Sequence, residues 1–313
     1  MGGLEQRQQT VSRSVFVDGL VLGGYNGGLY GRHGRAVAVR TGAAIEVRRH
    51  AMAEPVFRYE KKESGRIVVM TLNRPERMNA LNTGLANALA DGWERFAADD
   101  EAWVAIVTGA GDRAFCAGMD LRERADLDTQ GKTQQVKRRV IYPLAETLNL
   151  WKPTIAAING YCLAGGWNIA QQCDIRIAAE HAEMGISETR WNVGAGWVHT
   201  LSRQLLLAHA LEIALWGDKR ITAQRAYEMG WVNRVVPKER LMDEAMDWAR
   251  RMLYLGPRTV RNLKEIIYRG YHMSPLDGKA FAQALEENII GLEDTVEGPK
   301  AFAEGRKPVF KNR

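Results

Sequence analysis

The stretch IAAINGYCLAGGWNIAQQCDIRIAAEHAEMGISETRWNVGAG, residues 155–196, decides the fold prediction. It begins with an apolar run typical of a buried β-strand, turns at Asn159 and Gly160, and opens a helical pattern at Gly165 and Gly166. A helix entered through glycines leaves backbone N–H groups unpaired, and such groups bind anions or developing negative charge. The stretch therefore predicts a strand, turn and helix with an oxyanion site at the turn.

A second glycine-containing loop lies upstream, at residues 115–121 (FCAGMDL), after the strand-like run at residues 103–108. Small residues at Cys116, Ala117 and Gly118 let the backbone approach a ligand closely, and Asp120 is placed early in the next helix. One backbone donor from each loop can bind a single oxygen atom. We therefore expect the two loops to form one site.

Apolar runs and helical spacing alternate on both sides of these loops, which is an α/β pattern. The predicted strands are residues 56–60, 67–72, 103–108, 155–158, 174–178 and 232–236. The predicted helices are residues 83–98 with Thr83 as the cap, 134–150, 165–173, 223–229, 239–253, 256–268, one starting at 274, and 293–304. Proline in the first turn marks two of these helix starts, at Pro257 and Pro275.

Five motifs resemble those of the crotonase, or enoyl-CoA hydratase/isomerase, superfamily in order and spacing. They are LNRPERMNAL (72–81), AFCAGMDL (114–121), KPTIAAINGYCLAGG (152–166), CDIRIAAE (173–180) and GISET (185–189). The resemblance covers roughly residues 55–313. It implies an α/β fold, a crotonase-like spiral of repeated strand-strand-helix units with a C-terminal helical region.

The resemblance and the composition together predict a division of the chain into three parts. Residues 1–51 hold ten of the 31 glycines and no lysine, so we predict a disordered N-terminal extension. Its arginine-rich composition is similar to that of a transit peptide, although the glycines disfavour an amphipathic helix. The alternative, which we favour, is that the natural protein starts at Met52 and that these residues are an upstream extension. Residues 52–250 are the expected crotonase core. Residues 251–313 are the expected C-terminal helical oligomerisation region, because in the family this region packs across subunits in homotrimers or hexamers.

Charge and cysteine content exclude several classes of protein. Residues 1–51 carry net +4 of the chain's +6, so the body is nearly neutral and we expect no nucleic-acid partner. No apolar run approaches the roughly 18 residues that span a bilayer, so we expect no membrane partner. The odd count of three cysteines, without metal-ligand spacing, predicts buried thiols in a cytoplasmic protein and no metal site.

The chemistry that the resemblance implies begins with a thioester carbonyl held by two backbone donors. Polarising this carbonyl makes the neighbouring carbon acidic, and each well-aimed donor contributes roughly 3 to 4 kcal/mol in the transition state. By position, the donors are the N–H groups of Met119 and Gly165. The competing interpretation is that both glycine turns serve only close packing.

Glu188, in the GISET motif, falls where the family carries its downstream catalytic glutamate, and a proton would move through it. Two-glutamate hydratases of the family have another glutamate at the position of Asn168. An amide cannot carry a proton at neutral pH, although it can hold a water or a substrate hydroxyl. The sequence therefore offers one strong base.

Substrate-binding residues are assigned by the same resemblance. They are Arg77, the backbone of Ala117, Gly118, Met119, Asp120 and Leu121, the backbone of Gly165, Gly166 and Trp167, and in addition Trp191 and Gly196. The indoles of Trp167, Trp191 and Trp197 either shape the acyl pocket or complete the core. We expect no permanently bound cofactor, with coenzyme A entering as part of the acyl-CoA substrate.

An enoyl-CoA hydratase-type lyase that works through an enolate is the favoured function. A double-bond isomerase needs only one base and is the first alternative. The second alternative is a hydroxycinnamoyl-CoA hydratase-lyase, because that group also lacks the upstream glutamate and resembles this chain at Ser187, Glu188 and Trp191. That group carries a tyrosine shortly after the aspartate of the first loop, where this chain has Arg124. A non-catalytic CoA-binding or RNA-binding member is the remaining alternative.

Overall fold

The computed structural model describes residues 15–17, 20–22, 30–31, 37–41, 44–48 and 54–313. The chain divides into two units, Met1–Glu54 and Pro55–Arg313. In the first, β1 (Val15–Val17), β2 (Leu20–Leu22) and β3 (Tyr30–Gly31) pair antiparallel, and β4 (Val37–Thr41) pairs with β5 (Ala44–Arg48). Most of the segment for which we predict disorder lies outside the described residues.

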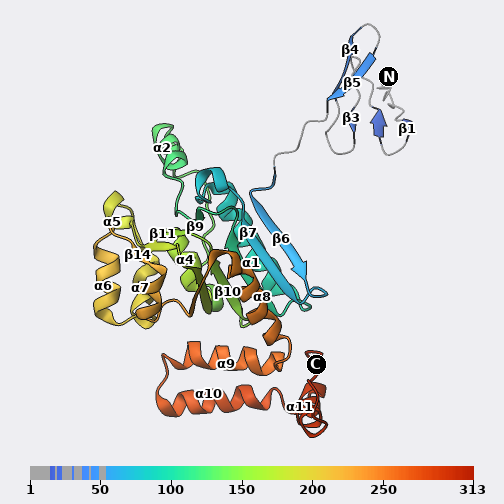
Figure 1. Ribbon diagram of the computed structural model, residues 1–313, viewed down its shortest axis with the longest axis vertical. Helices are drawn as coiled ribbons and strands as arrows, with labels where there is room; N and C mark the ends of the chain where they lie inside the picture. Colours follow the sequence, from blue (N-terminus) through green and yellow to red (C-terminus); the bar gives the residue numbers. More distant parts are fainter. Residues whose placement is uncertain (1–14, 18–19, 23–29, 32–36, 42–43, 49–53) are drawn as a thin grey trace, which may run out of the picture. The chain divides into compact units, whose positions relative to one another are not determined.

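A six-stranded sheet forms the centre of the second unit, in the order β15-β12-β10-β8-β7-β6. Figure 1 labels β6, β7 and β10 of this sheet. Its strands are β6 (Phe57–Lys62), β7 (Ile67–Leu72), β8 (Val104–Gly109), β10 (Thr154–Ile158), β12 (Ile175–Ala179) and β15 (Arg234–Val236). All neighbours run parallel except β6, which is antiparallel to β7. The predicted strands of this sheet are confirmed. β7, β8 and β10 are buried along their whole length, as long apolar runs predict for parallel strands, whereas β6, on the antiparallel edge, is mostly exposed.

A four-stranded sheet carries the second strand of each repeat, in the order β14-β13-β11-β9. Its members are β9 (Ala114–Cys116), β11 (Tyr161–Leu163), β13 (Glu183–Gly185) and β14 (Ile221–Thr222). The repeats are β8, β9 and α2 (Leu121–Thr129), then β10, β11 and α4 (Gly165–Gln172), then β12, β13 and α5 (Glu188–Trp191). The predicted spiral of strand-strand-helix units is confirmed.

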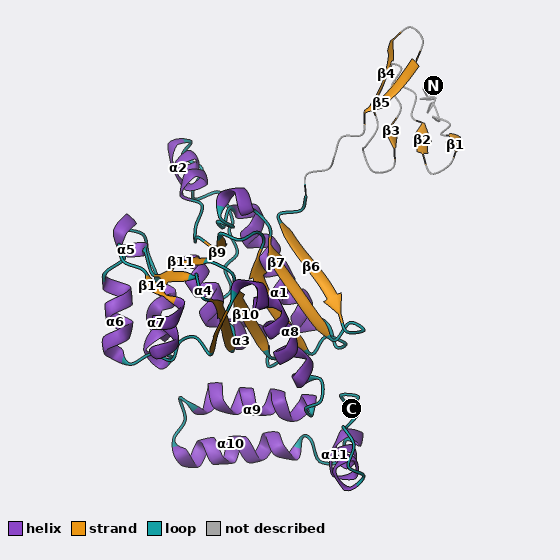
Figure 2. Cartoon of the chain, in the orientation of Figure 1, coloured by secondary structure: helices purple, strands orange, loops and turns teal. Residues whose placement is uncertain are grey.

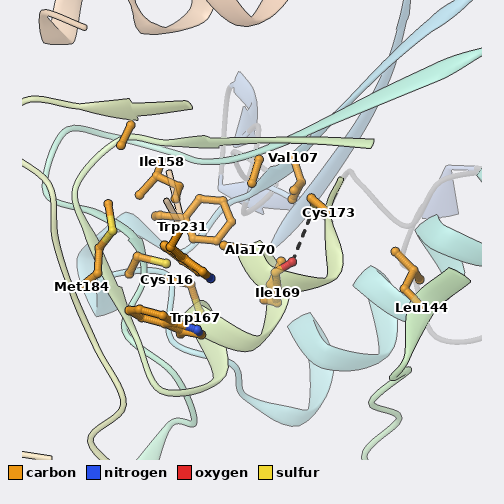
Figure 3. Close-up of a cluster of buried hydrophobic side chains, with 14 of the residues drawn as sticks. Val107, Cys116, Leu144, Ile158, Trp167, Ile169, Ala170, Cys173, Met184 and Trp231 are labelled. Carbon is orange, nitrogen blue, oxygen red and sulfur yellow. Dashed lines mark hydrogen bonds between the residues drawn. The ribbon is translucent and has the colours of Figure 1, made fainter. Parts of the chain in front are cut away.

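Two hydrophobic clusters cover the two faces of the six-stranded sheet. Alternate residues of β7 enter different clusters: Met70 packs with the first, and Val69 with the second, since successive side chains of a strand point to opposite faces. The first cluster, part of which is shown in Figure 3, contains α1 (Thr83–Ala98) and α4 side chains. The second lies under α8 (Leu241–Met252). Asn82, rather than the predicted Thr83, caps α1 by accepting a hydrogen bond from Leu85 N.

The predicted helix at residues 134–150 is wrong. Only α3 (Leu144–Leu148) is helical there, and it begins directly after Pro143. Proline lacks a backbone N–H and its ring crowds the preceding turn, so it disfavours a helix that runs through residue 143. The preceding residues are held against α1 instead. Asn87 binds this segment with both ends of its amide, because its Oδ1 accepts from Arg139 N at 2.8 Å and its Nδ2 donates to Lys137 O at 3.2 Å.

Short helices complete the body and long ones form the C-terminal region (Figure 2). They are η1 (Pro75–Arg77), η2 (Gly196–Arg203), α6 (Leu207–Leu215), α7 (Ala223–Glu228), η3 (Lys238–Arg240), α9 (Pro257–Gly270), α10 (Pro275–Glu287) and α11 (Glu293–Ala303). The predicted helix starts at Pro257 and Pro275 are confirmed. Among the described residues, no helix is long and apolar enough to span a membrane.

Candidate active site

The two glycine loops that the sequence singles out are in contact. Gly118 has a φ of +90°, and a Cβ added to it would lie 2.7 Å from the Cβ of Ala164 and 3.2 Å from Gly165 N. Only glycine combines this left-handed backbone with so close an approach. The loop after β9 and the start of α4 therefore meet, as predicted.

The backbone around Met119 leaves one donor free. Leu81 and Met119 form a parallel β-bridge, in which Leu81 N donates to Gly118 O at 2.7 Å and Asp120 N donates to Leu81 O at 3.1 Å. In such a bridge the N–H of the central residue points away from the partner strand. Gly165 is the first residue of α4, so its backbone N–H likewise has no helical carbonyl one turn earlier to accept a hydrogen bond. Neither nitrogen donates a hydrogen bond within the described part of the chain.

Both residues line one cavity of about 300 Å³. Its wall is mainly apolar and includes Leu89, Trp93, Ile141 and Trp197. Its polar side chains are Arg138, Arg139, Tyr142, Asn168, Gln172, Ser187 and Glu188. Two free backbone donors, one carboxyl group and an apolar wall suit a ligand with one carbonyl oxygen and an apolar body.

Glu188 brings a carboxyl group with an altered acidity into this cavity. It is the first residue of α5, is only 6% exposed, and its Oε2 has no hydrogen-bond partner among the described residues. Burial raises the pKa of Glu188 to about 7, an effect partly offset by backbone N–H groups and by the side chain of Trp197. Protonated and ionised forms therefore coexist near neutral pH, as general acid–base chemistry requires.

Asp120 holds the loop that carries Met119 rather than facing the cavity. Its Oδ1 accepts from the N–H groups of Arg122 and Glu123 at the start of α2, and its Oδ2 pairs with Arg74 Nη2 at 3.0 Å. Burial alone would raise the pKa of Asp120, but these donors outweigh it and lower that pKa. Sequence reasoning missed Arg74, whose partner lies 46 residues away.

Cys116 lies directly before this loop and is fully buried. Its Sγ accepts a hydrogen bond from Gly118 N at 3.4 Å. Burial raises the pKa of the Cys116 thiol to about 12, although the Gly118 N–H and Arg74 act in the opposite direction. The thiol therefore stays protonated.

The structure brings many of the predicted site residues to the cavity wall. These are Ala117, Met119, Leu121, Gly165, Asn168, Glu188, Trp191 and Gly196. The others do not line it: Gly118 and Gly166 pack the loops together, Asp120 caps α2, and Arg77 is exposed on η1.

The indole of Trp167 completes the core, which decides between the two interpretations of this side chain, while the assignment of the Trp167 backbone to substrate binding stays a prediction. Its indole is fully buried and stacks on Trp231, with ring centroids 3.8 Å apart (Figure 3). The next residue along α4, Asn168, faces the cavity in its place. Sequence reasoning also missed Ile141 and Tyr142, because the segment that carries them was assigned to a helix.

The comparisons with known proteins agree with this geometry. The family model described as Enoyl-CoA hydratase/isomerase matches residues 62–313, which contain every cavity residue. The chain belongs to the enoyl-CoA hydratase/isomerase family. This family member is 34% identical over 250 residues to (E)-benzylidenesuccinyl-CoA hydratase from Thauera aromatica, covering 79% of the chain and 96% of that protein. It is 34% identical over 256 residues to carnitinyl-CoA dehydratase from Salmonella enteritidis, covering 80% and 97%.

Solved structures place this enoyl-CoA hydratase/isomerase family member in the same fold. Enoyl-CoA hydratase from Bacillus anthracis matches with a TM-score of 0.73 at 33% identity, covering 82% of the chain and 100% of that structure. Enoyl-CoA hydratase from Mycobacterium tuberculosis matches with a TM-score of 0.73 at 32% identity, covering 83% and 100%. The crotonase fold and the assignment as an enzyme of this family follow from these matches.

Proposed function

We propose that this enzyme reversibly hydrates an enoyl-CoA thioester, with Glu188 as its single acid–base group. The N–H groups of Met119 and Gly165 bind the thioester oxygen and stabilise the enolate that forms during the reaction. The observation that carries the proposal is a buried carboxyl group with a pKa of about 7 in the same cavity as two unpaired backbone donors.

Hydration needs one proton to leave a water molecule and one to reach the substrate. The Glu188 carboxylate takes a proton from water, whose oxygen bonds to the β-carbon as the double-bond electrons move onto the thioester oxygen. The enolate then collapses, and its α-carbon takes the proton back from Glu188. One water is added, and Glu188 returns to its starting state. A pKa near the working pH suits a group that both accepts and donates.

The names of the relatives support addition or removal of water. They include (E)-benzylidenesuccinyl-CoA hydratase, carnitinyl-CoA dehydratase and mevalonyl-coenzyme A hydratase. The apolar cavity wall supports an acyl group that is itself mainly apolar. Coenzyme A enters as part of this substrate in the proposal, and no permanently bound cofactor takes part.

Double-bond isomerisation is the second candidate, and one observation favours it. Glu188 is the only carboxyl group among the described residues that line the cavity. A single base that removes a proton at one carbon and returns it at another is sufficient for an isomerase.

Labelled solvent distinguishes the two reactions. Enoyl-CoA thioesters of differing chain length and aromaticity are incubated in oxygen-18 water and the products are analysed by mass spectrometry. Labelled 3-hydroxyacyl products support hydration, and an unlabelled product with a moved double bond supports isomerisation. If no thioester is turned over, both candidates are excluded.

The proposed base is tested by substitution. We expect Glu188→Gln to reduce turnover by at least a hundredfold, in line with the loss of a general acid–base group, while thioester binding is kept. The exposed Glu146, which lies outside the cavity, provides the control Glu146→Gln with unchanged turnover. Retained turnover in Glu188→Gln would remove the assignment.

We also propose that the protein assembles as a homotrimer or hexamer through its C-terminal helices. Within α9–α11 only Pro257 and Ala301 are buried. Large apolar side chains there are exposed in the single chain, among them Ile267 at 70% and Phe302 at 89%. Leu263, at 54%, lies one turn before Ile267 on the same face of α9. Neighbouring exposed apolar side chains of this kind favour an interface.

A further inference from the structure

Gln172 lies four residues after Asn168 on α4, and both residues line the cavity. We infer that Gln172 locks the side-chain amide of Asn168 so that it presents only N–H donors, and that these donors position an oxygen atom on the third carbon of the acyl group. The inference rests on the proposed acyl-CoA function and adds a substrate feature and a positioning residue to it.

The backbone N–H of Leu144 fixes the orientation of the Gln172 amide. Leu144 is the first residue of α3 and is buried, and the residue before it, Pro143, provides no side-chain cap. Its backbone N–H would therefore lack an acceptor. Gln172 supplies one, because Leu144 N donates to Gln172 Oε1 at 2.8 Å. Since a backbone N–H can only donate, the accepting atom of the Gln172 amide must be its oxygen.

The Gln172 amide in turn orients the amide of Asn168. With its oxygen facing Leu144, Gln172 donates from Nε2 to Asn168 Oδ1 at 2.9 Å. Residues four apart lie on the same face of a helix, where such amide pairs are stabilising. Asn168 Oδ1 is thus engaged inside the protein. The remaining group, Nδ2, is a pure donor and makes no hydrogen bond among the described residues.

The Nδ2 donor of Asn168 requires a hydrogen-bond acceptor from the ligand. Asn168 is 4% exposed and lines the cavity. An acyl group that excludes water from this donor without bringing an acceptor would leave it unsatisfied, at a cost of about 1 to 3 kcal/mol. A ligand that brings an acceptor is therefore favoured over one that does not. A water oxygen that accepts from Asn168 while donating its proton to Glu188 is oriented for addition. A hydroxyl or carbonyl oxygen on the third carbon offers the same acceptor in the product or in an analogue.

A substitution of Gln172 can reverse the arrangement without removing either side chain. In Gln172→Glu one carboxylate oxygen still accepts from Leu144 N, but the other can only accept as well. Asn168 must then donate to it and turn its own oxygen toward the cavity. Gln172→Met removes the lock without adding charge, and it serves as the second variant where Gln172→Glu fails to fold.

The test compares two inert thioesters, butanoyl-CoA and 3-oxobutanoyl-CoA, which differ only by a carbonyl on the third carbon. Their dissociation constants are measured by calorimetry below pH 7, where the ketone form is kept. We expect the wild-type enzyme to favour the 3-oxo compound by roughly three- to tenfold, which is the effect of one neutral hydrogen bond. Gln172→Glu should abolish or reverse this preference, and Gln172→Met should reduce it.

The outcomes separate the inference from the function on which it rests. Because each protein is compared with itself on two ligands, a general loss of stability does not change the ratio. Equal ratios in the wild type and both variants, or no preference in the wild type, would overturn the role of Gln172 and leave the proposed function intact. Failure of the wild type to bind either thioester would instead exclude the proposed function together with the inference.

Discussion

At the scale of one residue, the raised pKa that suits Glu188 to its proposed chemistry also affects the stability of the fold. Burial raises the pKa of this carboxyl from 4.5 to about 7. Between these values the folded protein holds a proton that the unfolded chain has released. Stability therefore falls as the pH rises from about 4.5 to 7, because the folded state must then carry a buried charge.

Glu188→Gln should remove this pH dependence. Above pH 7 we expect the free energy of unfolding to increase by up to about 3 kcal/mol relative to wild type, since each unit of pKa shift corresponds to about 1.4 kcal/mol. Below pH 4.5 the two proteins should be nearly equal. Urea unfolding at both pH values measures the difference, with Glu146→Gln as the control. An equal difference at both pH values would contradict the raised pKa.

The element that carries the site is α4, together with the loop after β9. At its second residue, Gly166, an added Cβ would lie 2.1 Å from Cys116 O. The strand end and the helix start therefore approach each other as closely as two backbones can. This close packing is what brings the Gly165 N–H beside the Met119 loop.

Gly166→Ala should force these two elements apart. We expect destabilisation of about 1 to 3 kcal/mol or more, together with weaker thioester binding. Gly278→Ala in α10 is the matched control, because the nearest atom, Met273 Cβ, is 3.8 Å from an added Cβ. In the control variant the free energy of unfolding should increase by about 0.5 to 1 kcal/mol, since alanine favours a helix more than glycine does. Thermal unfolding compares the pair, and a stable, fully active Gly166→Ala would refute the packing argument.

Most of the helices, long strands and glycine loops could be predicted from the sequence. The long apolar runs of the six-stranded sheet and the glycine loops have strong local patterns. Strands of two or three residues such as β9 and β14 carry too little periodicity to be detected. Residues 134–143 have helical apolar spacing, but the amide of Asn87 binds the backbone of residues 137 and 139 and Pro143 interrupts the pattern, so the segment is not helical. The roles of Arg74 and Gln172 depend on contacts with residues distant in sequence.

At the scale of the whole molecule, the exposed apolar face of α9 should be covered in solution. We expect a trimer or hexamer by analytical ultracentrifugation, and smaller species for the double variant Leu263→Lys and Ile267→Lys, whose side chains are 54% and 70% exposed. Lys279→Gln, on the exposed surface of α10, is the control. A wild-type monomer, or a double variant that sediments like wild type, would argue against this interface.

The buried thiol of Cys116 has a consequence for any acyl thioester bound nearby. A thiolate beside an activated thioester would exchange with it, so the acyl group would pass to the protein and coenzyme A would be released. With a pKa of about 12 and no exposed surface, Cys116 cannot carry out this transthioesterification. The loop can therefore polarise a thioester without the enzyme acylating itself.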